Sequence, residues 1–129
     1  SYSDLGEKRK AIEDYNKAIE LNPEYTDAYN NRGNRYGDLG ETGKAIEDYN
    51  KAIELNPEYV MAYNNRGNSY SDLGEEEKAI GDYNKAIELN PEYALAYYNR
   101  GICYKKLGET KKAEKDFQKA AELDLKYKK

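Results

Sequence analysis

Apolar residues recur at spacings of three and four along much of the chain, which is the period of an amphipathic helix. Within residues 42–55, one apolar stripe comprises Ala45, Ile46, Tyr49, Ala52 and Ile53. No stretch of strand length alternates between apolar and polar residues, as a half-buried β-strand would. The pattern therefore predicts an all-α protein.

Glycine and proline divide this pattern into pairs of helices. Residues 27–39 and 42–55 are predicted to form two helices, with Gly40 breaking the chain between them. Asn56 and Pro57 end the second helix, because a proline disfavours helical backbone in the residue before it and cannot donate to the helical ladder. Each such pair is expected to fold as an antiparallel hairpin.

The same pattern returns every 34 residues. Leu-Gly pairs end at Gly6, Gly40, Gly74 and Gly108. The string Asn-Pro-Glu-Tyr contains Pro23, Pro57 and Pro91. Internal repeats of this length stack on their neighbours to bury a continuous core. We expect one array over residues 1–129, made of a half repeat 1–25, full repeats 26–59, 60–93 and 94–127, and a tail 128–129.

The repeat resembles the tetratricopeptide (TPR) repeat, which has the signature W-x2-L-G-x2-Y, then A-x3-F, then P. The matching residues of the first full repeat are Tyr29, Gly33, Tyr36, Ala45, Tyr49 and Pro57. Those of the later repeats are Tyr63, Gly67, Tyr70, Ala79, Tyr83 and Pro91, then Tyr97, Gly101, Tyr104, Ala113 and Phe117. The resemblance covers the whole chain and implies a right-handed superhelical solenoid of about three and a half repeats.

Aromatic residues also follow the repeat. The chain has 15 tyrosines, and each can bury a large ring while keeping one polar atom. All except Tyr98 fall into four columns of the repeat, which we interpret as packing positions. The glycine column is predicted to let the two helices of a hairpin approach closely. The expected pairs are Gly33 with Ala45, Gly67 with Ala79, and Gly101 with Ala113.

The two ends of the array differ from its middle. Residues 1–5 match only the tail of a first helix, so the helix expected at 8–21 lacks its own partner, and we expect the chain to be a fragment of a longer array. Its apolar stripe should then seek another surface, including a second copy of the chain: Ala11, Ile12, Tyr15, Ala18 and Ile19. The last repeat has Glu114 where the others have isoleucine, as a polar terminal repeat should.

An arginine stands where the family has a leucine, immediately before the first-helix glycine. These residues are Arg32, Arg66 and Arg100, and a second-helix column offers Asp48, Asp82 and Asp116. In an antiparallel hairpin each guanidinium would point toward the carboxylate of its own repeat, where a bidentate bond can form. In a first alternative, the arginines contact a ligand directly. In a second, Asp14 pairs with Arg32 of the next repeat.

Composition removes most catalytic and metal chemistry. The chain has no histidine and a single cysteine, Cys103, which we expect to be a small packed residue. Every glycine belongs to the repeat or its loops, so no phosphate loop and no cofactor are expected. The net charge of -4 disfavours nucleic acid, and no apolar run has the roughly 20 residues of a membrane helix. One free thiol suits a reducing, cytoplasmic location.

In TPR arrays the first helices line an inner groove that binds peptides, and asparagine is prominent here. The expected groove residues are Asn30, Asn31, Asn34, Met61, Asn64, Asn65, Asn68, Leu95, Tyr98, Asn99, Ile102 and Lys105. Asparagine is a poor helix-interior residue, but its amide can bond both polar groups of a peptide backbone. The column Asn31, Asn65 and Asn99 resembles the Asn ladder of the O-GlcNAc transferase TPR superhelix. Bonds between neighbouring helices would explain the same column.

The groove is expected to be graded and to have one aromatic anchor. Its early end is amide and acidic, and its late end is apolar and basic, with Tyr98 as the exposed anchor. Asn65 and Arg66 resemble the Asn-Arg element of the carboxylate clamp in chaperone-binding TPR domains. Asparagine stands where the clamp has its first lysine, so clamp function is not expected.

These features predict a non-catalytic scaffold for a protein or extended peptide. The alternatives are a self-assembling structural array and the substrate-recruiting arm of a larger enzyme.

Overall fold

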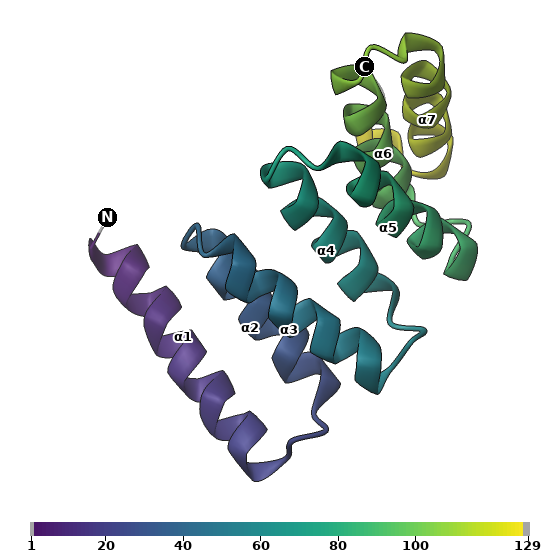
Figure 1. Cartoon of the computed structure of the whole chain (residues 1–129). Coiled ribbons are helices and arrows are strands. Elements are labelled where there is room, and N and C mark those ends of the chain that lie inside the picture. Colours follow the sequence, from purple (N-terminus) through teal and green to yellow (C-terminus); the bar gives the residue numbers. More distant parts are fainter. Residues whose placement is uncertain (1, 128–129) are drawn as a thin grey trace.

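The computed structural model describes residues 2–127, and every regular element among them is helical. The elements are α1 (Tyr2–Leu21), α2 (Thr26–Asp38), α3 (Thr42–Leu55), α4 (Val60–Asp72), α5 (Glu76–Leu89), α6 (Ala94–Lys106), α7 (Thr110–Leu123) and the short 3-10 turn η1 (Leu125–Tyr127). Three hairpins, α2–α3, α4–α5 and α6–α7, follow α1 and stack into a curved superhelix (Figure 1). The predicted all-α solenoid is confirmed, and α2 and α3 lie within one residue of their expected bounds.

The turn inside each hairpin is built on one glycine with left-handed backbone. Gly40 has a φ of 78°, a conformation that costs glycine little because it has no Cβ. The Gly40 amide donates to the Gly37 carbonyl, and the Glu41 amide donates back to the Tyr36 carbonyl. These two bonds satisfy carbonyls at the end of α2 and turn the chain into α3.

The loop between hairpins explains the repeated Asn-Pro-Glu-Tyr string. The Asn56 side-chain oxygen accepts from the Glu58 amide at 3.1 Å, and the Asn56 carbonyl accepts from the Tyr59 amide at 3.0 Å. The Pro57 carbonyl accepts from the hydroxyl of Tyr63 on α4 at 2.9 Å. The loop therefore carries both the helix stop and a bond to the next helix.

The start of the chain differs from the sequence-based expectation. Residues 2–5 do not form a separate helix tail, and α1 runs without a break through Gly6 to Leu21. Gly6 does not have the positive φ that Gly40, Gly74 and Gly108 have at the hairpin turns. The physical reason is that residues 2–5 are too few to pack back as a helix, so a continuous helical ladder satisfies more backbone groups.

The close approach of helices inside each hairpin is confirmed, but the partner of the glycine is a ring. A Cβ built on Gly67 would lie 2.7 Å from Cε1 of Tyr83, and the same position in the last repeat, Gly101, faces Phe117 at 2.8 Å. The alanines expected opposite the glycines are fully buried at the interfaces, with Ala79 at 0% exposure. The glycine column therefore makes room for an aromatic side chain of the facing helix.

One face of α1 is less covered than the same face of the later second helices. Tyr15 is half-buried, whereas Tyr49 and Tyr83 in the same column are 3% and 1% exposed. Asp14 is exposed, whereas Asp48 is buried. The difference arises because, within residues 2–127, α1 packs mainly against α2, whereas α3 and α5 each pack against the helices before and after them.

Each arginine of the column joins three helices. Arg66 donates from Nε and Nη2 to the Asp82 carboxylate at 2.9 and 2.7 Å, the predicted lock within a repeat. Its Nη1 donates to Asn50 of the preceding hairpin at 2.9 Å. Arg32 and Arg100 repeat the arrangement, with Asn16 and Asn84 as their second acceptors.

The column therefore stabilises each hairpin and also its junction with the hairpin before it. The hydrogen bonds that Arg66 donates to the Asp82 carboxylate raise the pKa of Arg66. Arg32 donates to the side-chain oxygen of Asn16 on α1, so the alternative pairing with Asp14 is wrong.

Cys103 is a packed residue, as expected, and this has a chemical consequence. Its side chain is 1% exposed against Ala79 and Tyr83, and burial raises the pKa of the thiol to about 12. The raised pKa lowers the thiolate fraction at neutral pH, and the thiolate is the reactive form.

We expect native Cys103 to react with a thiol-specific disulfide reagent at least ~100-fold more slowly than the same chain in denaturant. The reaction can be followed by absorbance at neutral pH. Equal rates in the two conditions would contradict the buried position of the thiol.

Candidate functional site

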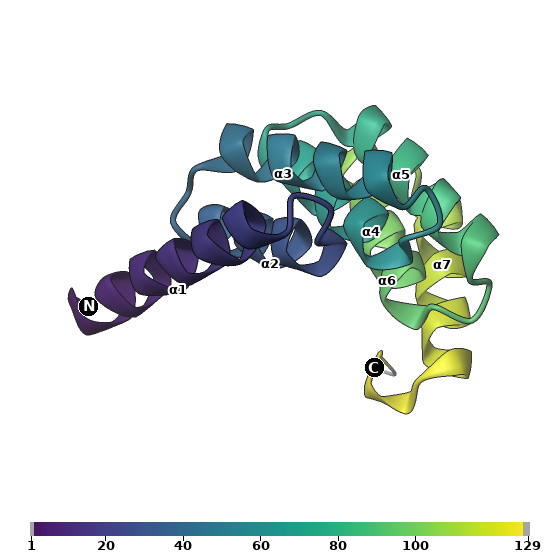
Figure 2. The same ribbon diagram turned by 90° about the horizontal axis from the view of Figure 1, so that it is seen from below.

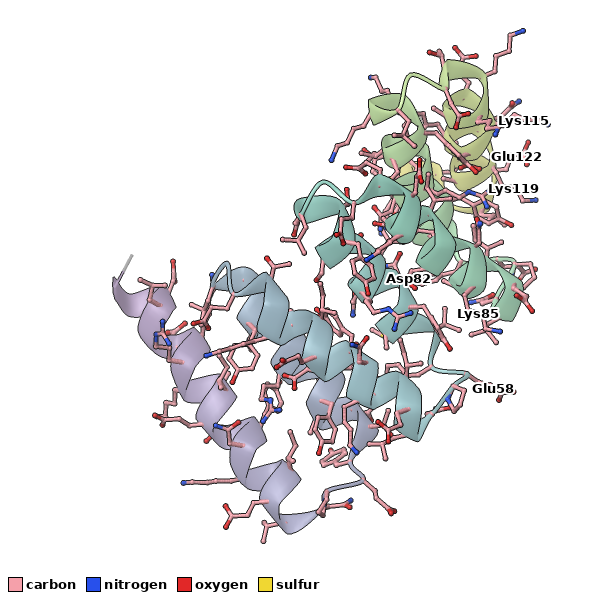
Figure 3. All side chains as sticks on the ribbon, in the orientation of Figure 1. Glu58, Asp82, Lys85, Lys115, Lys119 and Glu122 are labelled. Carbon is pink, nitrogen blue, oxygen red and sulfur yellow. The ribbon has the colours of Figure 1, made fainter. Side chains whose placement is uncertain are left out.

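The first helices α2, α4 and α6 lie side by side along the inner side of the curve. Contacts join α2 to α4 and α4 to α6, in addition to those inside the hairpins. Figure 2 shows α3 and α5 along the outer side of the arch. Figure 3 shows Lys115, Lys119 and Glu122 extending outward from α7. The inner surface is thus formed mainly by the repeat's asparagine-rich helices.

The asparagine ladder bonds neighbouring first helices to each other. Asn65 donates from Nδ2 to the Asn30 oxygen at 3.1 Å, and Asn99 donates in the same way to Asn64 at 3.2 Å. Asn30 and Asn64 have 0% exposure. Their prediction as groove residues is therefore wrong, because their side chains lie between adjacent helices and are covered by the next hairpin.

Two other asparagines are held by tyrosine hydroxyls. The Tyr49 hydroxyl donates to the Asn34 oxygen, and the Tyr83 hydroxyl to the Asn68 oxygen, both at 2.6 Å. Burial raises the pKa of Tyr49 and keeps the hydroxyl protonated as a donor. The last repeat has Ile102 and Phe117 at the equivalent positions, so the hydroxyl and the amide are lost together. That paired loss leaves no buried polar group without its bond.

A cavity of about 340 Å³ lies between the C-terminal halves of α2 and α4. It is lined by Asn34, Arg35, Gly37, Asp38, Tyr49, Asn65, Asn68, Ser69 and Asp72. Three predicted groove residues, Asn34, Asn65 and Asn68, thus meet at one place. Arg35 pairs with Asp38 at 3.1 Å on the same helix.

The predicted aromatic anchor packs against its own hairpin instead. The ring of Tyr98 lies 5.5 Å from Phe117 of α7 and 4.8 Å from Tyr127 of η1, measured between centroids. Tyr98 occupies the column of Asn30 and Asn64, which faces the following repeat. Within residues 2–127, η1 contacts the ring on the side where α4 and α6 cover Asn30 and Asn64. The assignment of Tyr98 as an exposed anchor is therefore wrong.

The remaining predicted residues are more dispersed. Met61 is 51% exposed at the start of α4, and four others are partly exposed: Asn31, Leu95, Asn99 and Ile102. Lys105 is exposed and borders a second, more apolar cavity of about 350 Å³, shared with Thr110, Ala113, Glu114 and Phe117. The structure thus brings Asn34, Asn65 and Asn68 together. The predicted groove residues of the last repeat do not line the same cavity.

Sequence reasoning missed part of the cavity wall. Tyr49 was assigned to packing alone, although its ring also lines the cavity. Arg35 and Ser69 occupy the column that holds Cys103 in the last repeat. This column holds a different residue in each full repeat, next to the constant tyrosine column of Tyr36, Tyr70 and Tyr104, and that variability is the signal that could have identified it.

Within residues 2–127, no group of three or more Cys, Asp or Glu side chains is placed to hold a metal ion. None of the described helices has the length and apolar character needed to cross a membrane.

Comparisons with known proteins agree with the repeat architecture. The crystal structure of MamA is similar to this chain with a TM-score of 0.85 and 35% identity, over 97% of this chain and 73% of that chain. A second MamA crystal structure has a TM-score of 0.83 and 35% identity, over 97% and 68%. No curated protein matches the sequence.

A third similar structure contains a bound peptide. The first TPR of Spaghetti (RPAP3) bound to the HSP90 peptide SRMEEVD has a TM-score of 0.76 and 30% identity, over 78% of this chain and 79% of that one. Profiles of the TPR repeat match residues 1–40, 33–74 and 67–108, and a tetratricopeptide repeat profile matches residues 94–127. The chain belongs to the tetratricopeptide repeat family of protein-interaction scaffolds.

Proposed function

We propose that this chain is a non-catalytic scaffold that binds an extended polypeptide along the inner surface of α2, α4 and α6. The observation that carries the proposal is the cavity between α2 and α4, where three asparagine side chains meet. An extended segment leaves its backbone amides and carbonyls unpaired, and side-chain amides can satisfy both. A helical ligand would have these groups already bonded within itself.

A free C-terminal carboxylate is not the ligand that we propose, despite the peptide in the RPAP3 structure. Arg66, the basic residue of the clamp-like Asn-Arg pair, already donates to Asp82 and Asn50. Asn64, in the column of the first clamp lysine, is buried. Neither residue offers a free positive charge to a carboxylate.

The test begins with selection of peptides from a phage-displayed random library against the immobilised chain. A recovered peptide is synthesised and titrated into isotope-labelled chain by NMR. We expect an affinity on the order of micromolar and shifts of the side-chain amides of Asn34, Asn65 and Asn68. The blocking variant is Gly37→Gln, because Gly37 lines the cavity and has open space around its Cβ position.

The matched control is Gly43→Gln on α3, where the Cβ position is equally open. Gly37→Gln should weaken binding at least ~10-fold, the effect of losing about 1.4 kcal/mol, and Gly43→Gln should leave it unchanged. Equal behaviour of the two variants would place the binding surface elsewhere.

Self-association through α1 is a second candidate, which the half-buried ring of Tyr15 favours. Sedimentation over a concentration series separates the two, because a scaffold that binds peptide as a monomer keeps one sedimentation coefficient.

A further inference from the structure

We propose that the cavity between α2 and α4 receives a lysine or arginine side chain of the bound segment, with Asp72 as its counter-ion. The inference rests on the proposed function and adds the chemistry of the partner. Three observations carry it: the fixed orientation of the cavity amides, the unmatched carboxylate of Asp72, and the internal pairing of the cavity's own arginine.

Bonds within the array determine what each amide can offer a ligand. The oxygens of Asn34 and Asn68 accept from tyrosine hydroxyls, so their Nδ2 groups remain as donors toward the cavity. The Nδ2 of Asn65 donates to Asn30, so its oxygen remains as an acceptor. Two donors and one acceptor match two carbonyls and one amide of an extended backbone. These bonds hold the backbone of the segment. Selection among different sequences therefore depends on contacts with its side chains.

One column of the repeat supplies the selecting charge. Its members in the three full repeats are Asp38, Asp72 and Lys106. Asp38 pairs with Arg35 at 3.1 Å, and Lys106 lies 3.8 Å from a Glu76 oxygen and 3.3 Å from the Ser71 hydroxyl. Asp72 makes no ion pair or hydrogen bond among the described residues, and it lines the cavity.

The charges around the cavity therefore favour a cation. Arg35 contributes one positive charge, which Asp38 offsets, and the Asp72 carboxylate is left over. A lysine or arginine of the segment would form a charge-assisted bond with it. Asp72 is exposed, so the attraction is screened by salt and its contribution is moderate. An acidic or neutral side chain cannot form this bond with Asp72.

The experiment uses the same phage-displayed library against three versions of the whole chain: unmodified, Asp72→Asn, and the control Glu47→Gln. Glu47 is an exposed carboxylate on α3 and is not part of the cavity. We expect lysine and arginine to be enriched among peptides selected by the unmodified chain and by Glu47→Gln, and the enrichment to vanish with Asp72→Asn.

A recovered peptide then enters a double-mutant cycle with its basic residue replaced by glutamine. The replacement should weaken binding to the unmodified chain about threefold to fivefold, the upper part of the range for an exposed pair, and by less than twofold for Asp72→Asn. Groove-binding peptides without basic residues, or equal losses with both chains, would overturn this inference. The proposed function would still stand in that case if Gly37→Gln blocks binding, and it would fail only if Gly37→Gln does not.

Discussion

Replacing Asp82 with alanine is expected to lower the free energy of unfolding by about 3 kcal/mol, the lower end of the cost of breaking a buried ion pair. Asp82 is 6% exposed and accepts two hydrogen bonds from Arg66, which is itself only about one-fifth exposed. Removing the carboxylate leaves the guanidinium largely desolvated, with a hydrogen bond to Asn50 and the rings of Tyr63 and Tyr70 beside it but no counter-ion bonded to it among the described residues. The remaining access to water is the reason for choosing the lower end of the range.

Urea denaturation followed by circular dichroism measures the change. Glu88→Ala on the same helix is the control, because Glu88 pairs with Lys85 at 3.8 Å and is 72% exposed. An exposed pair of this kind contributes ~0–1 kcal/mol. Figure 3 shows the contrast between Asp82, which lies near α4, and Lys85, which extends outward from α5. If the two substitutions lower the free energy of unfolding equally, the pair of Arg66 and Asp82 stabilises the fold no more than an exposed ion pair does.

Gly67→Ala is the second substitution with a large expected effect, a loss of about 2 kcal/mol. The added Cβ would lie 2.7 Å from Cε1 of Tyr83 and 3.0 Å from its neighbours in the ring. The ring cannot move easily, because Tyr83 is 1% exposed and its hydroxyl is bonded to Asn68. Overpacking a close contact costs ~1–3 kcal/mol, which exceeds the gain of up to ~1 kcal/mol from replacing a helical glycine.

Gly81→Ala on α5 is the matched control, because Gly81 is exposed and nothing lies within 4 Å of its Cβ position. This substitution should stabilise the chain by up to ~1 kcal/mol. The two glycine replacements are thus expected to have opposite signs in one thermal or urea series. A gain in stability from Gly67→Ala would show that the hairpin relaxes around the new methyl group.

The hairpins could be predicted from sequence because their boundaries depend on local chemistry. The left-handed turn at Gly40 and the stop at Pro57 follow from the backbone preferences of single residues. The ion pair between Arg32 and Asp48 could also be predicted, since it depends only on the antiparallel arrangement of one hairpin. The course of α1 through Gly6 was not, because the preference of one glycine does not decide whether a partner helix exists.

The site was only partly predictable, because it depends on the angle between successive hairpins. Asn30 and Asn31 are adjacent, yet the first is buried between helices and the second is partly exposed. Tyr98 was assigned to the groove because it lies outside the tyrosine columns, but its own column faces the next repeat. The hypothesis of bonds between neighbouring helices is confirmed for Asn65 and Asn99. Packing between repeats decides which columns are buried and which are exposed. The repeat period alone does not carry that information.

The arginine that joins successive hairpins bears on how such an array can evolve. Each interior repeat carries a complete set: an arginine, the aspartate of its own lock, and an asparagine that accepts from the next arginine. Duplicating or deleting one 34-residue unit would therefore leave no guanidinium without both of its acceptors. The length of the array can change by whole units at no cost in unpaired charge, so recombination within the gene can lengthen or shorten the inner surface while every junction stays intact.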